Sequence, residues 1–188
     1  MDKKELRKRL RILSGSLSEC YKKEADKAIT EKVTTLPLFK KSKSVFIYVS
    51  TENEPNTRAI IAEAWAQGKD VYVPKCLTGN TMQAFRLNSF DELHIGAFGI
   101  PEPDASCLTS PDSFDIAVVP CISAWTDGRR LGHGAGYYDR FFENCEAVKI
   151  CLCFEKMLCE EIPVSEHDVY MDYLITEECI NEIKRSCH

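Results

Sequence analysis

The sequence contains no apolar run long enough to span a membrane, and no apolar stretch follows its basic N-terminus as in a signal peptide. It holds ten cysteines among 188 residues, yet no Cys-x-x-Cys pair occurs, so zinc and dithiol redox motifs are unsupported. Because no secretion signal is present, we expect the thiols to be reduced and the protein to be cytoplasmic.

The sequence also lacks an excess of positive charge. Its 24 lysines and arginines are outnumbered by 29 aspartates and glutamates, which gives a net charge of −5. This balance argues against a general nucleic-acid binder and leaves small molecules as the expected partners. No repeat, low-complexity segment or linker occurs, so the length predicts a single domain over residues 1–188, which we expect to be a monomer.

Short apolar strands alternate with helices along the chain. Residues 45–49 and 116–120 are almost continuously apolar, which is typical of strands buried on both faces of a parallel sheet. Further strands are expected at 71–73, 82–85, 148–154 and 174–176, and helices at the leucine-periodic N-terminus, after the Ser16-x-x-Glu19 capping box, at about 57–67, from Tyr137 and at 177–187. The pattern predicts an α/β fold, with an open, mainly parallel (mixed) sheet flanked by helices on both faces.

The expected ligand site lies at one edge of this sheet. Ligands of open α/β sheets bind beyond the carboxyl ends of the strands. The loops that follow candidate strands are therefore expected to share that edge; they are residues 50–57, 74–81, 120–136 and 163–168.

One stretch, residues 128–140, combines an arginine pair, three alternating glycines, two tyrosines and an aspartate. Its glycines allow a concave turn that a ligand can approach closely, and successive amide N–H groups in such a turn form an anion-binding nest. A breaker-free run from Tyr137 predicts a helix start, which suits a phosphate. Arg129 and Arg130 add cationic groups at the entrance, so the stretch predicts a phosphate cradle.

Alternating glycines alone often mean only a tight loop, and that interpretation stays open for the glycine pattern by itself. The stretch is not the dinucleotide fingerprint, whose last two glycines are spaced differently. It is not a Walker loop either, because no Lys-Ser or Lys-Thr follows the last glycine. The combination of residue types in one run favours a binding role, since packing does not require it.

The run Arg130-Leu131-Gly132-x-Gly134-x-Gly136-Tyr137-Tyr138-Asp139 resembles the signature of the 5-formyltetrahydrofolate cyclo-ligases, also called 5,10-methenyltetrahydrofolate synthetases. Four other segments resemble motifs of this family in the family's order: Lys3-x-x-Leu6-Arg7, Val49-Ser50-x-x-x-Glu54-x-x-Thr57, Gly99-Ile100-Pro101-Glu102-Pro103 and Val164-Ser165-Glu166-His167-Asp168. The resemblance covers nearly the whole chain.

The resemblance implies a ligase that uses ATP and Mg²⁺ to convert 5-formyltetrahydrofolate to 5,10-methenyltetrahydrofolate, with release of ADP and phosphate. Phosphorylation of the formyl oxygen would turn a poor leaving group into a good one, and the second folate nitrogen would then close the ring. Phosphoryl transfer needs charge neutralisation and alignment more than covalent catalysis. The catalytic residues implied are Arg130, Tyr137 and Asp139.

The same resemblance implies binding residues. The nucleotide would contact Lys3, Lys4, Arg7, Arg130, Leu131, Gly132, His133, Gly134, Ala135, Gly136, Tyr137 and Tyr138. The folate would contact Val49, Glu54, Phe98, Ile100, Pro101 and Tyr137. Magnesium would be held by Asp139 and Asp168, since this hard cation takes few carboxylates and several waters.

Plainer interpretations compete with these assignments. Asp139 early in a helix can be only a favourable dipole partner, and Glu54 in a loop can be only solvated. His167 is expected to be an orienting or surface residue rather than a metal ligand. At the level of function, the rivals are a non-catalytic module that binds nucleotide or folate, and a sugar-phosphate isomerase or CoA-transferase-like enzyme on a similar frame.

Overall fold

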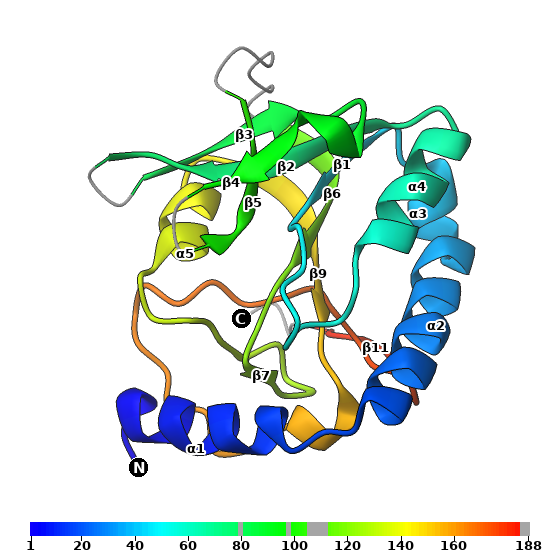
Figure 1. Ribbon diagram of the computed structural model, residues 1–188. Coiled ribbons are helices and arrows are strands. Elements are labelled where there is room, and N and C mark those ends of the chain that lie inside the picture. Colours follow the sequence, from blue (N-terminus) through cyan, green and yellow to red (C-terminus); the bar gives the residue numbers. More distant parts are fainter. Residues whose placement is uncertain (79–80, 97–98, 105–112, 185–188) are drawn as a thin grey trace.

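The computed structural model describes residues 1–78, 81–96, 99–104 and 113–184 (Figure 1). Within these residues the centre of the molecule is a seven-stranded sheet in the order β11-β10-β9-β6-β1-β2-β3. Its strands are, in chain order, β1 (Ser44–Ile47), β2 (Asp70–Cys76), β3 (Met82–Arg86), β6 (Ser113–Val119), β9 (Glu146–Leu152), β10 (Tyr173–Ile175) and β11 (Ile180–Glu182).

The five inner strands run parallel, and the edge strands β3 and β11 are antiparallel to their neighbours. The predicted mainly parallel, mixed sheet is therefore confirmed. From β1 the chain moves to β2 on one side, whereas β6, β9 and β10 follow one another on the other side. The strand order reverses between β1 and β6, and ligands of open α/β sheets bind at such a reversal.

Helices cover both faces of the sheet, and one more crosses its end (Figure 1). The helices α2 (Glu19–Thr35), α3 (Pro37–Lys41) and α4 (Arg58–Ala66) lie on one face, and α5 (Tyr137–Phe142) lies on the other. The basic helix α1 (Lys3–Gly15) runs across the carboxyl edge of the parallel strands. No helix in the described ranges is both long enough and apolar enough to cross a membrane.

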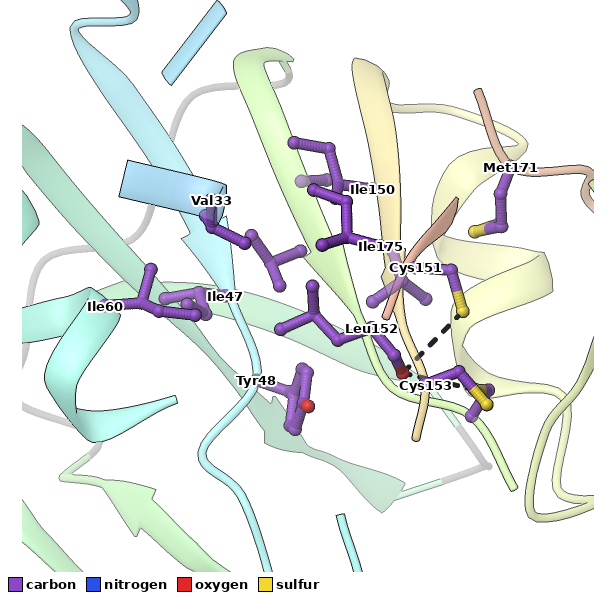
Figure 2. Packing of buried hydrophobic residues seen from close by; sticks show 14 of the residues in the cluster. Val33, Ile47, Tyr48, Ile60, Ile150, Cys151, Leu152, Cys153, Met171 and Ile175 are labelled. Carbon is purple, nitrogen blue, oxygen red and sulfur yellow. Dashed lines mark hydrogen bonds between the residues drawn. The ribbon is translucent and has the colours of Figure 1, made fainter. Parts of the chain in front are cut away.

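Successive side chains of β1 build the two halves of the core. Phe46 stacks on Phe141 of α5, with the ring centroids 4.8 Å apart. Ile47 points to the opposite face, toward Ile60 of α4 and Val33 of α2 (Figure 2). A strand that packs against helices on both sides must be apolar at consecutive positions, which explains its unbroken hydrophobic sequence.

Two small hairpins lie beside the main sheet. β4 (Leu93–Ile95) pairs with β5 (Pro101–Pro103), and this hairpin packs on β2. β7 (Ser123–Ala124) pairs with β8 (Arg130–Leu131) and delivers the chain into the glycine stretch. Each hairpin thus places one segment of the resemblance close to the carboxyl edge of the sheet.

At two places local hydrogen bonds produce a structure that differs from the sequence-based prediction. The predicted closing helix at 177–187 is wrong: Thr176 Oγ1 accepts the N–H groups of Glu178 and Cys179, and this turn reverses the chain into β11. Residues 185–188 lie outside the described residues. The predicted capping box is also wrong, because Ser18 caps α2 whereas Ser16 donates back to Leu13 O at the end of α1.

Candidate active site

A cavity of about 940 Å³ opens at the carboxyl edge of the sheet, around the point where the strand order reverses. α1 and α5 border it, the segments that follow β1, β6 and β9 contribute to its wall, and β2 contributes Pro74 and Cys76. Residues from each of the four segments expected at this edge line the cavity, but Pro74 and Cys76 belong to β2 itself, so the loop expected from residue 74 begins later than predicted.

One end of the cavity, called the cationic end below, consists of Lys3, Arg7, Arg11 and Arg130 together with two aspartates. Lys3 Nζ lies 2.5 Å from Asp168 Oδ2. The charges of Arg11, Asp168 and Asp139 all act on Arg7, so these groups form one cluster. Such a cluster offers several cations to an anionic ligand while it keeps its own carboxylates paired.

Arg130 is the most enclosed of these cations. Its side chain is 4% exposed; Nη2 donates to Asp139 Oδ1 at 2.8 Å and Nη1 donates to the Pro120 carbonyl at 3.1 Å. The guanidinium lies 5.6 Å from the ring centre of Tyr138. Its buried Nε–H has no partner in the described part of the chain. Arg130 therefore fixes Asp139 in place and retains one unsatisfied donor.

Each glycine of the loop lies against an arginine side chain. A β-carbon added to the loop would lie 2.9 Å from Arg130 at Gly132, 3.2 Å from Arg7 at Gly134, and 2.8 Å from Arg140 at Gly136. Gly134 and Gly136 also have φ values of +111° and +69°, which L side chains rarely adopt. The glycines thus let guanidinium groups pack on the loop backbone, and Arg7 Nε secures this contact by donating to Gly132 O at 2.8 Å.

The other end of the cavity, called the carboxylate end below, consists of Glu54 and Glu102 among Val49, Pro74, Cys76, Met82 and Ile100. Glu54 Oε2 accepts both the N–H and the hydroxyl of Thr51, and Glu54 Oε1 lies 3.1 Å from His133 Nε2. Burial alone would raise the pKa of Glu54, but the hydrogen bonds from His133 and Thr51 outweigh it and hold the pKa below its usual value. Glu54 is therefore a buried, ionised acceptor.

Two tyrosines lie near enough to Glu54 to be affected by its charge. Tyr48 is buried and donates its hydroxyl to the Pro55 carbonyl at 2.8 Å. Burial raises the pKa of Tyr48 and of Tyr138, and the nearby charge of Glu54 raises both further. Both phenols stay protonated at neutral pH and act as neutral walls of the cavity.

A model of the 5-formyltetrahydrofolate cyclo-ligase family matches residues 1–177. The chain belongs to this family. A probable 5-formyltetrahydrofolate cyclo-ligase of Caenorhabditis elegans is 34% identical over 193 aligned residues, which cover 93% of this chain and 92% of the relative. The mouse 5-formyltetrahydrofolate cyclo-ligase is 30% identical over 188 aligned residues, which cover 93% of this chain and 91% of the mouse protein.

Solved structures agree with this assignment. The 5,10-methenyltetrahydrofolate synthetase of Aquifex aeolicus matches with a TM-score of 0.88 at 30% identity, covering all of this chain and 96% of the other. The synthetase of Mycoplasma pneumoniae matches with a TM-score of 0.76 at 21% identity, which supports the fold. The chain is thus an enzyme of a family named for its substrate, 5-formyltetrahydrofolate, and its product, the methenyl folate.

Most residues that the cyclo-ligase resemblance selected line the cavity: Lys3, Arg7, Val49, Glu54, Ile100, the run from Arg130 to Asp139, and Asp168. Three do not. Lys4 lines a separate outer groove with Lys8. Pro101 lies in β5 outside the wall, and Phe98 lies outside the described residues. The individual roles of all these residues stay predictions.

Several wall residues were missed by the sequence analysis. Arg11 follows Lys3 and Arg7 at four-residue steps on α1, so helical spacing could have revealed it. Glu102 stands inside a quoted motif but was passed over in favour of its apolar neighbours. His167 borders the cavity with a side chain that is 79% exposed and pairs with Glu166, which fits the expected surface role.

Magnesium was expected at Asp139 and Asp168. No group of three metal-type ligands occurs among the described residues. Asp168 is occupied on both oxygens by Lys3, and its Oδ2 also accepts the Ser165 N–H. Among the described residues, the bonds of Asp139 to Arg130 and to the Val169 N–H both use Oδ1. The donors fit a magnesium ion held mainly by phosphates and water, with Asp139 as the more available carboxylate.

Proposed function

We propose that this cyclo-ligase family member uses ATP to close 5-formyltetrahydrofolate into 5,10-methenyltetrahydrofolate, with release of ADP and phosphate. One observation carries the proposal: a single cavity joins a cationic end, which suits a triphosphate, to an apolar end with buried carboxylates, which suits a nitrogen heterocycle. A reaction between these two ligands needs a binding site for each of them within one cavity.

The reaction has two steps. The formyl oxygen attacks the γ-phosphorus, and ADP leaves. The second folate nitrogen then attacks the activated formyl carbon, the carbon–oxygen bond breaks, and phosphate leaves with the oxygen and the proton of that nitrogen. No oxidant or reductant is needed, and the protein has to neutralise charge and align the groups.

Residues at the cationic end are proposed to bind the nucleotide. Lys3 and Arg7 are only partly buried, so their charges can turn toward phosphate oxygens. The amides of the loop from Gly132 to Gly136 provide further donors. α5 spans only six residues, so the loop amides and the arginines, rather than a helix dipole, support phosphate binding here. Arg130 holds Asp139 and leaves a buried donor unsatisfied, which is typical of a site that a ligand completes.

Magnesium is proposed to be held by Asp139, and by Asp168 once Lys3 has moved to a phosphate. When bound, it supplies positive charge to the phosphates between which the bond breaks. The chain prepares this by holding the Asp139 carboxylate against the Arg130 guanidinium.

Residues at the carboxylate end are proposed to bind the folate. Glu54 is ionised and buried, so it can accept N–H groups of the pterin ring. Tyr137 and Tyr138 line the same cavity and offer aromatic surfaces to a planar ring. This division of the cavity orients the formyl group toward the phosphates.

An absorbance assay tests the proposal. Purified protein with ATP, magnesium and 5-formyltetrahydrofolate should generate the near-ultraviolet absorbance of the conjugated methenyl product, with ADP formed in equal amount. Omission of any one component should abolish the signal. A protein that binds both ligands and forms no product at any magnesium concentration would establish the non-catalytic alternative instead.

A further inference from the structure

One hydrogen bond joins the two segments of the cavity wall to which different ligands are assigned. His133 Nε2 lies 3.1 Å from Glu54 Oε1. His133 belongs to the glycine loop that is proposed to bind phosphates, whereas Glu54 lies in the loop after β1, at the end proposed for the folate. A contact between two ligand-binding segments couples the two ligands if binding of either one changes it.

The bond from His133 completes the donors around Glu54. Thr51 donates its N–H and its hydroxyl to Oε2 at 2.9 Å and 2.8 Å, and among the described residues His133 is the donor to Oε1. The Glu54 side chain is 8% exposed, so these donors offset the cost of burying its charge. A folate N–H group directed at Oε1 therefore competes with the imidazole for the same oxygen.

The imidazole can leave Glu54 while the backbone of the loop stays in place. The His133 side chain is 53% exposed, and a contact with such an exposed partner contributes little to stability. Arg7 holds the backbone on both sides of this residue, because its Nε donates to Gly132 O at 2.8 Å and its guanidinium packs against Gly134. Rotation of the His133 side chain is thus the least costly change that frees Oε1.

A bound nucleotide lowers the cost of that rotation. In the ligand-free protein the displaced imidazole exchanges a carboxylate partner for water. With phosphates on the amides of the same loop, the imidazole has a second anion close to its own backbone and can donate to it instead. The loss of the bond to Glu54 is then compensated, so folate displaces His133 more easily when the nucleotide is present.

We propose that His133 is a positioning residue that couples the two substrates: it occupies Glu54 Oε1 in the ligand-free protein and turns to the nucleotide phosphates when folate takes its place. This rests on the proposed function, which places the phosphates on the glycine loop and the pterin at Glu54. Coupling between binding sites is reciprocal, so each substrate binds more tightly in the presence of the other. The complex that holds both substrates is thereby favoured over the complexes that hold one.

Calorimetry measures the coupling in the absence of turnover, with 5-formyltetrahydrofolate, magnesium and the non-hydrolysable ATP analogue adenylyl imidodiphosphate. The coupling factor is the ratio of the folate dissociation constants without and with saturating analogue. We expect a factor of about 5 to 50 for the wild type and of about 2 or less for His133→Ala. His94→Ala, which removes an exposed histidine outside the cavity, is the matched control and should keep the wild-type factor.

The affinity for folate alone distinguishes coupling from direct contact between His133 and the folate. Without nucleotide, folate has to displace the imidazole from Glu54 in the wild type but not in His133→Ala. At neutral pH the variant should therefore bind folate alone about 2- to 10-fold more tightly than the wild type. A histidine that contacts the folate itself would give weaker binding in the variant and would overturn the inference.

His133→Gln is the conservative variant. Its amide keeps an N–H donor for Glu54 but cannot carry a positive charge toward a phosphate. We expect its affinity for folate alone to stay within about twofold of the wild type, and its coupling factor to lie between those of the wild type and His133→Ala. A purely structural role of His133 would lower the thermal unfolding midpoint of His133→Ala and leave its coupling factor at the wild-type value.

The outcomes separate this inference from the proposed function. If the wild type forms methenyl product but its coupling factor is 1, or if His133→Ala keeps the wild-type factor, His133 does not couple the substrates and the proposed function stands. If the wild type binds both ligands without turnover, the proposed function fails, and the coupling factors still decide the inference. If the wild type does not bind folate, both fail.

Discussion

The two ends of the cavity treat charge in opposite ways. At the cationic end each aspartate has a cationic partner: Asp168 with Lys3 at 2.5 Å and Asp139 with Arg130 at 2.8 Å. At the carboxylate end Glu102 is bonded by the backbone N–H and the thiol of Cys76, and Glu54 depends on Thr51 and the half-exposed His133. The cationic end pairs its carboxylates with cations and has cations left over, whereas the carboxylate end satisfies its carboxylates with neutral donors and one histidine.

This difference separates the expected consequences of mutation. A charge that is paired within the protein contributes to the fold as well as to the reaction, so its loss affects stability and turnover together. A carboxylate that a ligand satisfies contributes mainly to affinity for that ligand. Substitutions at each end should therefore separate effects on stability from effects on ligand affinity.

The largest effect is expected for Asp139→Asn. Asparagine keeps an oxygen for Arg130 but leaves the enclosed guanidinium without a countercharge. We expect turnover to fall about 100-fold or more and the free energy of unfolding to fall by about 1–3 kcal/mol. Steady-state kinetics at limiting magnesium and thermal unfolding measure the two losses.

Asp70→Asn is the matched control for that variant. Asp70 also pairs with an arginine, Arg86, but the two side chains are 46% and 41% exposed and lie outside the cavity. We expect a stability loss below about 1 kcal/mol and normal turnover. Normal turnover of Asp139→Asn at limiting magnesium would contradict the role of the cationic end in holding the metal.

A smaller effect is expected for Gly134→Ala, and it should fall on ATP. The methyl group would press on the Arg7 guanidinium at 3.2 Å and would sit at a φ of +111°. We expect ATP affinity to drop about 10- to 100-fold, because the displaced Arg7 and the distorted loop amides would no longer meet the phosphates. Folate affinity should change little, and calorimetry with each ligand measures both.

Gly68→Ala is the control that separates the cost of backbone strain from the loss of ATP binding in Gly134→Ala. Gly68 also has a left-handed φ, +71°, but nothing lies within 4 Å of its added β-carbon. We expect a similar loss of stability, about 1 kcal/mol, with unchanged ATP affinity. Equal ATP affinity of Gly134→Ala and the wild type would mean that the glycine loop does not bind phosphate.

Much of the fold was predictable because burial imposes periodicity on the sequence. The unbroken apolar runs of β1 and β6 identified parallel strands, and their loops identified the ligand edge. The C-terminal helix was mispredicted because one hydroxyl, Thr176 Oγ1, satisfies two backbone N–H groups and reverses the chain. Side-chain capping of this kind leaves no periodic pattern to detect.

The candidate site was predictable where its residues are contiguous in the sequence. It was less predictable where residues far apart in the sequence come into contact in the fold. The stretch from Arg130 to Asp139 was recognised by its composition. The partner of each glycine was not, since Arg7 meets Gly134 across more than a hundred residues. Glu102 was missed because its burial and lack of a cation depend on the β4–β5 hairpin and on β2.

The smallest effect is expected for His133→Ala, and it should fall on pH dependence at the carboxylate end. In the wild type the pKa of Glu54 lies below its ordinary value of 4.5, because the hydrogen bonds from His133 and Thr51 outweigh the raising effect of burial. The ionised form accepts from the folate, so affinity is full above the ordinary pKa and is lost as pH falls through the lowered one. Without His133, burial is opposed by Thr51 alone, the pKa of Glu54 rises, and folate affinity should be lost at a higher pH. Folate titrations from about pH 4 to about pH 8, with folding checked by circular dichroism at each pH, measure this shift.

His94→Ala, which removes an exposed histidine paired with Asp104 outside the cavity, should leave the profile unchanged. If His133→Ala and the wild type lose folate affinity at the same pH, His133 does not tune the pKa of Glu54, and Thr51 alone offsets the burial of this carboxylate.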